Sequence, residues 1–266
     1  MVSSFYGTDA AFINPPTEAI PIIACGDTHL DPGLAQTVKF WDTFSQHLTD
    51  TYGDFRLVLG GDIFKSEDLE GAEPVAVRAL SVFEEKVCLL VGNHDPKTWY
   101  SSLPNTPIQV YDHAISTRLD GSRLLYHHGD QLMPNGGDIT KRKLFNTGDS
   151  IDRWLIEKFG LSGAGRKALW LSHWGQILIS LARVPSNTTA VLFHTHIPTQ
   201  IKLGGRRQLI NPGGAFNYKP NGSMDFTLLT DNGKTMEIQG RHYDAKRTSI
   251  ERDDKYLKGM HKRIDV

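Results

Sequence analysis

The sequence has few cysteines, no long apolar run and almost no net charge, and each of these absences excludes a class of protein. Among 266 residues there are only two cysteines, Cys25 and Cys88, both within apolar runs, so we expect buried thiols and no disulfide framework. No run of about 18 apolar residues is present, so no membrane-spanning helix is predicted. The 29 Lys and Arg residues nearly balance the 30 Asp and Glu residues, and a net charge of −1 gives no overall attraction to nucleic acid or to an anionic membrane.

The first residues also lack the features of a secretory signal. A basic start and a long apolar core are both missing from MVSSFYGTDAAFINPPTEAIP. Together with the low cysteine content, this predicts a cytoplasmic protein. A chain of 266 residues can bury a substantial core, and we expect a single domain over residues 1–266, with an inserted lobe rather than two independent units.

What the sequence does contain is a series of apolar runs that end beside residues of metal-binding type. Four of them end in glycine next to Asp, Asn or His, namely IIACGDTH, LVLGGD, CLLVGNHD and LLYHHGD, and a fifth, AVLFHTH, ends in two histidines. In open α/β folds, the residues that follow buried strands lie on loops at one edge of the sheet, where ligands collect. These runs therefore predict one shared site.

The candidate ligands are carboxylate, imidazole and amide groups, and no thiolate is among them. They are Asp27, His29, Asp62, Asn93, His94, His128, His194 and His196. This mixture suits manganese, iron or zinc better than calcium or a structural zinc ion. The set has too many donors for one four-coordinate ion, so it predicts a centre with two metal ions.

The ordered series D-x-H, G-D, G-N-H-D, H-G-D and H-T-H resembles the calcineurin-like metallophosphoesterase superfamily. The series extends from Asp27 to His196 and covers most of the chain. Carried onto this sequence, the resemblance implies one metal ion held by Asp27, His29 and His196, a second held by Asn93, His128 and His194, and Asp62 as the bridge between them.

The resemblance also implies the chemistry of the site. Two divalent transition-metal ions, with manganese favoured over iron or zinc, would clamp a phosphoryl group and activate water for in-line attack. His94 would be the catalytic histidine, close to the metal ions but not bound to them, and Asp95 would hold its ring in the useful tautomer. The implied protein is a metal-dependent phosphoric ester hydrolase with a phosphorylated small-molecule substrate.

Two positions leave the geometry of the site open. Neighbouring residues of a strand face opposite ways, so only one of His127 and His128 is expected to reach the metal ions, and His128 matches the superfamily pattern. Superfamily members commonly have glycine before the last H-x-H, whereas this chain has Phe193. The phenyl ring would either fill the space beside the site or turn to the opposite face, which leaves the shape of the pocket undecided.

Strand and helix patterns alternate in the first half of the chain. The apolar runs IIAC, RLVLG and VCLLVG are typical of buried strands, and helical spacing over residues 34–52 and about 74–85 separates them. This βαβαβ order predicts a parallel sheet with right-handed crossovers.

The pattern changes after Pro107 to short runs with turns at Asp120-Gly121 and Asn232-Gly233, which predicts antiparallel strands of a second sheet. The predicted fold class is α/β, a two-sheet metallophosphoesterase sandwich of the αββα type with a helical cap insertion. The cap corresponds to residues from about 131 to 188, which have an amphipathic helical pattern. Since this segment interrupts the series of ligands, we expect it to lie over or beside the metal centre.

Three functions remain open. The first is hydrolysis of a phosphomonoester, phosphodiester or pyrophosphate bond in a small or medium substrate such as a nucleotide or sugar nucleotide. The second is a DNA exonuclease or endonuclease, because D-T-H-L, G-D-I-F and G-N-H-D resemble the nuclease branch of the superfamily, although the net charge argues against it. The third is a non-catalytic binding module. The sequence argues against it, because every expected metal ligand and His94 are present. No oligomeric state is predicted.

Overall fold

The computed structural model of the chain describes residues 10–13, 20–29, 35–63, 80–83, 86–92, 95, 109–111, 113–129, 184–194, 199–202, 207–213, 223–233, 235–244 and 249–252. The chain divides into two compact units, residues 1–128 with 184–266, and residues 129–183. Every described helix and strand belongs to the first unit. Residues 131–183 of the predicted cap lie outside the described residues, so the cap and the single-domain organisation remain predictions.

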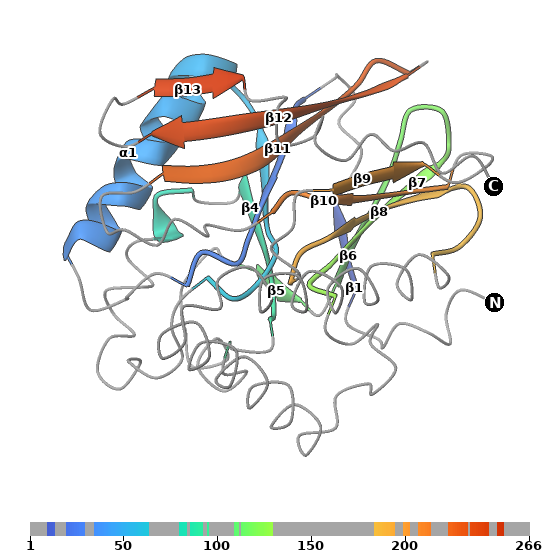
Figure 1. Cartoon of the computed structure of the whole chain (residues 1–266), viewed down its shortest axis with the longest axis horizontal. Helices are drawn as coiled ribbons and strands as arrows, with labels where there is room; N and C mark the ends of the chain where they lie inside the picture. Colours follow the sequence, from blue (N-terminus) through green and yellow to red (C-terminus); the bar gives the residue numbers. More distant parts are fainter. Residues whose placement is uncertain are drawn as a thin grey trace, which may run out of the picture. The chain divides into compact units, whose positions relative to one another are not determined.

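One sheet contains seven strands. They are β2 Ile22–Cys25, β3 Arg56–Leu59, β4 Val87–Leu90, β5 Gln109–Tyr111, β11 Ser223–Asp231, β12 Met236–Asp244 and β13 Ser249–Arg252. Their order is β13-β12-β11-β2-β3-β4-β5 (Figure 1). Strands β2 to β5 pair in parallel, whereas β11, β12 and β13 pair antiparallel with their neighbours. The parallel arrangement predicted for the first three apolar runs is confirmed.

Helix α1, Ala35–Tyr52, connects β2 to β3 and covers one face of this sheet (Figure 1). Its buried residues Trp41, Phe44 and Leu48 recur at three- and four-residue intervals, which forms the apolar stripe predicted from the sequence. The helix ends where the Gly53 N–H donates to the Thr49 carbonyl at 2.9 Å. Among the described residues, no helix is long and apolar enough to cross a membrane.

The other sheet contains six strands. They are β1 Ala10–Ile13, β6 His113–Thr117, β7 Arg123–His127, β8 Thr188–Leu192, β9 Thr199–Lys202 and β10 Gln208–Asn211. Their order is β1-β6-β7-β8-β10-β9, with antiparallel pairs β6–β7 and β9–β10. The hairpin predicted at Asp120-Gly121 is confirmed, because this turn joins β6 to β7.

The six-stranded sheet is mixed, because it also contains the parallel pairs β1–β6, β7–β8 and β8–β10. The prediction that both turns belong to the second sheet is wrong for one of them. The turn at Asn232-Gly233 joins β11 to β12, and these strands belong to the seven-stranded sheet, where β11 pairs with β2. Local sequence patterns specify strands and turns, but which sheet a hairpin joins depends on long-range packing.

The two sheets pack face to face across an apolar core. Ala24 and Val58 of the seven-stranded sheet share this core with Tyr126 of the six-stranded sheet. The adjacent residues Ile23 and Leu57 point the other way and pack with α1. Strands β2 and β3 are therefore buried on both faces, which explains their continuous apolar sequences.

Candidate metal centre

The loops after β2 and β3 continue the pairing of the two strands. The Asp27 N–H donates to the Gly61 carbonyl at 2.9 Å, and the His29 N–H donates to the Asp62 carbonyl at 3.0 Å. Since the strands are parallel, their carboxyl ends lie at the same edge of the sheet. Local backbone pairing therefore brings Asp27, His29 and Asp62 together.

The ends of β7 and β8 in the other sheet are joined in the same way. These strands are parallel, and just beyond them the Phe193 N–H donates to the His128 carbonyl at 3.0 Å. His128 and His194 consequently lie at the same end of the sheet. His128 belongs to a group of candidate metal ligands, whereas His127 belongs to none of the groups found among the described residues.

Two hydrogen bonds connect the two sheets at this point. The His128 ring donates from Nδ1 to the Gly60 carbonyl at 2.7 Å. The backbone N–H of His194 donates to Asp27 Oδ2 at 2.8 Å. The first bond joins residues 68 positions apart and the second joins residues 167 positions apart. The site is therefore assembled between the sheets by tertiary contacts.

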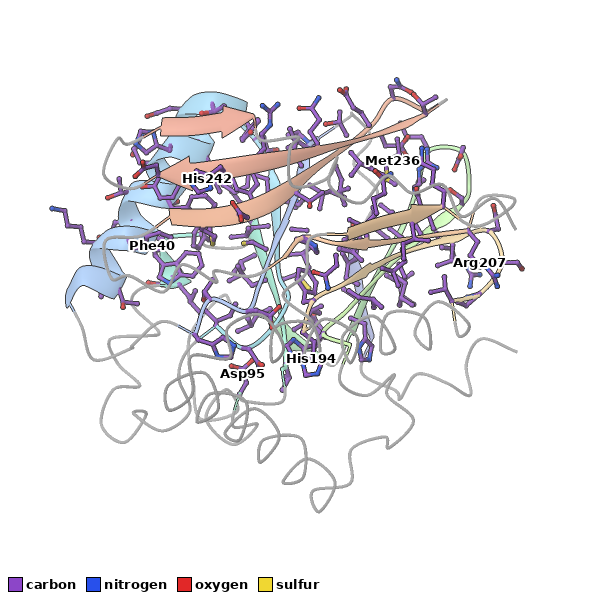
Figure 2. The ribbon with its side chains drawn as sticks, viewed as in Figure 1. Phe40, Asp95, His194, Arg207, Met236 and His242 are labelled. Atoms are coloured by element: carbon purple, nitrogen blue, oxygen red, sulfur yellow. The ribbon has the colours of Figure 1, made fainter. Side chains whose placement is uncertain are left out.

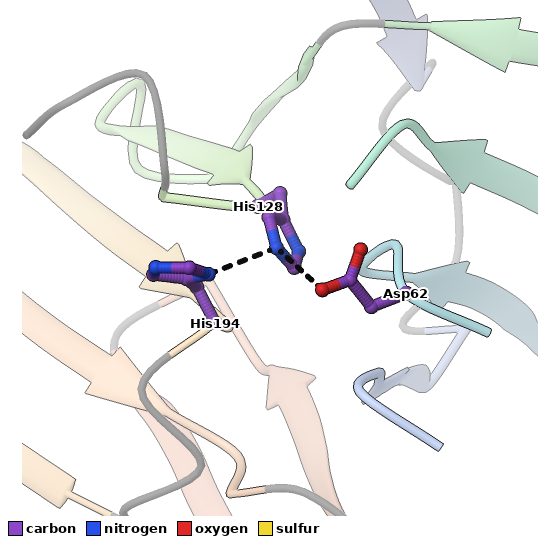
Figure 3. A group of neighbouring side chains, drawn as sticks. All are labelled: Asp62, His128 and His194. Carbon is purple, nitrogen blue, oxygen red and sulfur yellow. Dashed lines mark hydrogen bonds and ion pairs between the residues drawn. The ribbon is translucent and has the colours of Figure 1, made fainter. Parts of the chain in front are cut away.

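The described residues contain two groups of candidate metal ligands that share one carboxylate. Asp27, His29 and Asp62 form one group, and Asp62, His128 and His194 form the other (Figure 3). Within each group, one ligand atom of each residue lies within 4.8 Å of the others. His128 Nε2 is 3.3 Å from Asp62 Oδ2 and 3.2 Å from His194 Nδ1. A carboxylate shared by two ligand groups is suited to bridging a pair of metal ions.

The hydrogen bond to Gly60 decides which nitrogen of His128 is available to a metal ion. A carbonyl oxygen only accepts, so His128 Nδ1 carries the donated proton. In the neutral ring, Nε2 then directs a lone pair toward Asp62 and His194. Converging lone pairs and a carboxylate in a buried space fit a cation. A backbone carbonyl on the far nitrogen is also the usual support of a metal-binding histidine.

Three carboxylates are crowded into this part of the protein. Asp27, Asp62 and Asp95 are all buried. Burial raises the pKa of Asp27 well above its ordinary value, His128 opposes this rise, and the charge of Asp62 adds to it. Burial and then the charge of Asp62 raise the pKa of Asp95 to about 6. Buried negative charges are costly without compensation, so a divalent cation fits this set of donors.

The backbone is strained at four of the five candidate ligands that the structure describes. Asp27, His29, Asp62 and His194 have positive φ angles of 51°, 44°, 50° and 61°. Within the described part of the chain, only one other non-glycine residue, Asn187, has a positive φ. Such conformations cost about 1–3 kcal/mol each and concentrate at functional sites. Their coincidence with the candidate ligands supports a functional role for this region.

Phe193 turns away from the ligands into the core between the sheets. It is fully buried in the same apolar cluster as Ala24 and Val58. A Cβ added at Gly60 would lie 2.0 Å from Phe193 Cγ, and one added at Gly26 would lie 2.9 Å from Phe193 Cδ1. The ring therefore occupies the space that these two glycines leave. Of the two orientations expected from the sequence, Phe193 adopts the one that points away from the site.

Three of the predicted site residues lie outside the described residues. They are Asn93, His94 and His196. Their roles, and a contact between His94 and Asp95, stay predictions. Asp95 itself is described, and it lies with His194 at the same end of the strands (Figure 2). Its carboxylate accepts hydrogen bonds from backbone N–H groups of the two neighbouring loops.

One buried polar residue near the ligands was missed by the sequence analysis. Asn211, at the end of β10, donates from Nδ2 to the Phe193 carbonyl at 2.8 Å and accepts from the Gly213 N–H at 2.8 Å. It thereby holds the backbone directly before His194. The signal was present in the run QLIN followed by Pro-Gly-Gly, which is another apolar strand ending in a polar residue.

Comparison with known proteins identifies the family. The profile described as calcineurin-like phosphoesterase matches residues 20–233, most of the chain. The chain belongs to this family. Family membership confirms the resemblance carried by the ordered motifs, and the observed two-sheet sandwich confirms the predicted fold class apart from its cap.

Solved structures resemble this calcineurin-like phosphoesterase at low sequence identity. A dimetal phosphatase from Danio rerio has a TM-score of 0.53 and 11% identity, over 84% of this chain and 96% of that chain. Vps29 from Chaetomium thermophilum has a TM-score of 0.45 and 14% identity, over 88% of this chain and 97% of that chain. A search of curated sequences found no match. The likeness to the dimetal phosphatase supports the fold.

Proposed function

We propose that this chain is a phosphoric ester hydrolase that depends on two divalent transition-metal ions. The observation that carries the proposal is the pair of ligand groups that share Asp62. Two metal ions can be held side by side when one residue bridges two sets of ligands. Asp62 can be this bridge, because its buried carboxylate lies near His128 and His194 and also near Asp27 and His29. The calcineurin-like phosphoesterase family supports the same chemistry.

The proposal assigns a role to each ligand. Asp27, His29 and His196 would hold one ion, Asn93, His128 and His194 would hold the other, and Asp62 would bridge them. We propose manganese, with iron or zinc as alternatives, because imidazole and carboxylate donors without a thiolate suit all three metals. When bound, the two ions would stabilise negative charge on a phosphoryl group and increase the acidity of water.

The residues of the chain prepare this chemistry in separate ways. His128 is oriented by its hydrogen bond to Gly60, which leaves Nε2 as the ligand atom. The backbone bond from His194 to Asp27 keeps the two ligand groups at a fixed separation. His94, beside the ligand Asn93 in the sequence, would donate a proton to the leaving oxygen or stabilise charge on phosphorus.

We propose a phosphorylated substrate of small or medium size, such as a nucleotide or sugar nucleotide, cleaved at a phosphomonoester, phosphodiester or pyrophosphate bond. The balanced charge of the chain supports a small substrate over long DNA, because DNA binding relies on many contacts between cationic side chains and phosphates. A cytoplasmic location belongs to the same proposal, and it is supported by two free thiols that are not paired as a disulfide.

The first test is metal dependence. We expect protein freed of metal by chelation to be inactive on bis-p-nitrophenyl phosphate, and Mn²⁺ to restore turnover better than Mg²⁺, which suits oxygen donors rather than imidazole. Metal analysis of the reconstituted protein should give about two ions per chain, as a dinuclear site requires. Full activity in the metal-free sample would disprove the proposal.

A pair of variants tests whether Asp62 binds metal, as distinct from a general effect of removing one negative charge. Asp62→Asn should lower the metal content, because it removes charge from the residue common to both ligand groups. Asp231→Asn is the matched control, since it removes the charge of another largely buried carboxylate, one that belongs to neither group. Equal metal contents in the two variants would show that Asp62 is not a ligand.

A further inference from the structure

Asp95 is a buried carboxylate that holds two loops together. It is 7% exposed, and its Oδ2 accepts hydrogen bonds from the backbone N–H of Asp62 and from that of Gly92, both at 2.8 Å. Its own backbone N–H donates to the Gly92 carbonyl at 3.3 Å. One oxygen atom therefore links the loop after β3 to the loop after β4.

These contacts act on the proposed bridging ligand. Asp62 has a φ of 50°, a conformation that a non-glycine residue keeps only when its surroundings hold it. The bond from the Asp62 N–H to Asp95 is such a restraint, and a carboxylate acceptor makes it stronger than a neutral one would. Losing this acceptor would free the backbone that carries the Asp62 carboxylate.

The loops are also in close contact where Asp95 joins them. A Cβ added at Gly92 would lie only 2.1 Å from Asp62 Oδ1. The Asp62 carboxylate therefore rests against the backbone of Gly92, and a shift of either loop changes its position. Asp95 sets this separation, because it binds the N–H groups of both residues with one oxygen atom.

The position of Asp95 distinguishes it from the ligands. It does not belong to either group of candidate metal ligands within the described residues. A third buried carboxylate beside Asp27 and Asp62 adds electrostatic repulsion, which is costly. The two backbone hydrogen bonds that Asp95 accepts where the loops meet offset part of this cost.

We infer that Asp95 is a positioning residue for the metal centre, which acts on the bridging ligand Asp62 through the backbone. This inference rests on the proposed dinuclear site. It differs from a role in orienting the His94 ring, because it acts on metal binding rather than on proton transfer. The two roles predict different losses when Asp95 is replaced.

The test compares Mn²⁺ affinity in the full-length wild type, Asp95→Ala and Asp95→Asn by titration calorimetry. Loss of a residue that orients a ligand typically costs about 10–100-fold in metal affinity, and we expect this for Asp95→Ala. Asp95→Asn retains a neutral oxygen acceptor, so it should lose several-fold less affinity. If Asp95→Ala does not fold, Asp95→Glu moves the carboxylate by one methylene group and should also weaken Mn²⁺ binding.

Asp231→Ala is the control for the loss of a backbone-binding aspartate. Asp231 accepts from the Leu119 N–H at 2.9 Å and from the Gly233 N–H at 3.0 Å, away from the ligand groups, so Mn²⁺ affinity should not change. Wild-type Mn²⁺ affinity in folded Asp95→Ala or Asp95→Glu, with a lower kcat, would overturn the inference and favour a role through His94. Absence of Mn²⁺ binding in the wild type would instead overturn the proposed function.

Discussion

At the scale of single residues, four of the five described candidate ligands have backbone conformations that non-glycine residues rarely adopt. Asp27, His29, Asp62 and His194 all have positive φ angles. The restraints come from elsewhere, for example from the hydrogen bond between the His194 N–H and Asp27 and from that between the Asp62 N–H and Asp95. These hydrogen bonds hold the donor groups in place before a metal ion binds, as expected for a preorganised site.

Gly60 should tolerate no side chain. We expect Gly60→Ala to lower the free energy of unfolding by about 1–3 kcal/mol, because the added methyl group would overlap the Phe193 ring, whose Cγ lies 2.0 Å from the ideal Cβ position. Urea denaturation followed by tryptophan fluorescence measures the change.

A double-mutant cycle identifies the cause of that loss. Phe193→Ala removes the Cγ, Cδ1 and Cδ2 atoms that lie nearest to the added methyl group, so Gly60→Ala should be less damaging in this background than in the wild type. Residues in contact typically show coupling energies of about 0.5–3 kcal/mol. Additive effects would show that Phe193 is not the obstacle at Gly60, contrary to the packing described above.

At the scale of secondary structure elements, aromatic side chains attach α1 to the seven-stranded sheet. The ring of Phe44 lies 5.0 Å from that of Tyr243 and 5.7 Å from that of Phe226, between centroids. These partners belong to β11 and β12, strands almost two hundred residues farther along the chain. The helix therefore packs against strands that come from the far end of the sequence.

Phe44→Ala should destabilise the protein strongly. Truncation of a fully buried phenylalanine typically costs about 3–5 kcal/mol, and Phe44 is 0% exposed. Asp42→Ala on the exposed face of the same helix is the control, and it should change the free energy of unfolding by no more than about 0.5 kcal/mol. Chemical denaturation of both variants provides the comparison, and similar losses would contradict the packing of α1 on the sheet.

The elements themselves were largely predictable. The helix expected over residues 34–52 is α1, Ala35–Tyr52, and the runs IIAC, RLVLG and VCLLVG contain β2, β3 and β4. Their periodicity is a local property, set by residues within a few positions of each other. The sheet to which β11 and β12 belong was not predictable, because that choice depends on pairing with β2, far away in the sequence.

At the scale of the whole molecule, the balance of charge separates the two main substrate classes. A nuclease binds DNA mainly through phosphate contacts, so its activity falls steeply between about 50 and 200 mM salt. With a net charge of −1, we expect weak salt dependence of turnover on bis-p-nitrophenyl phosphate and on nucleotides, and little degradation of long DNA. Initial rates over this range of salt, with single- and double-stranded DNA in parallel, measure both.

The same experiment contains the result that would reverse this preference. Efficient degradation of single- or double-stranded DNA that declines steeply with salt would reject a small substrate and support the nuclease alternative. If turnover of nucleotides and of DNA both depended weakly on salt, net charge would no longer distinguish the two substrate classes. The relative rates on nucleotides and on DNA would then decide between them.

The sequence alone was enough to predict the candidate donors, the strands that precede them and the family. Asp, Asn and His after apolar runs are local features, and their order along the chain is specific enough to identify relatives. How the described residues come together depends on tertiary packing. The Phe193 ring turns into the core, Asp95 binds two loops through their backbone, and His128 reaches Asp62 at 3.3 Å from another sheet. The contact of Asp95 with Asp62 depends on the pairing of β3 with β4 within one sheet, and those of Phe193 and His128 depend on the packing of the two sheets against each other. No local pattern specifies either arrangement.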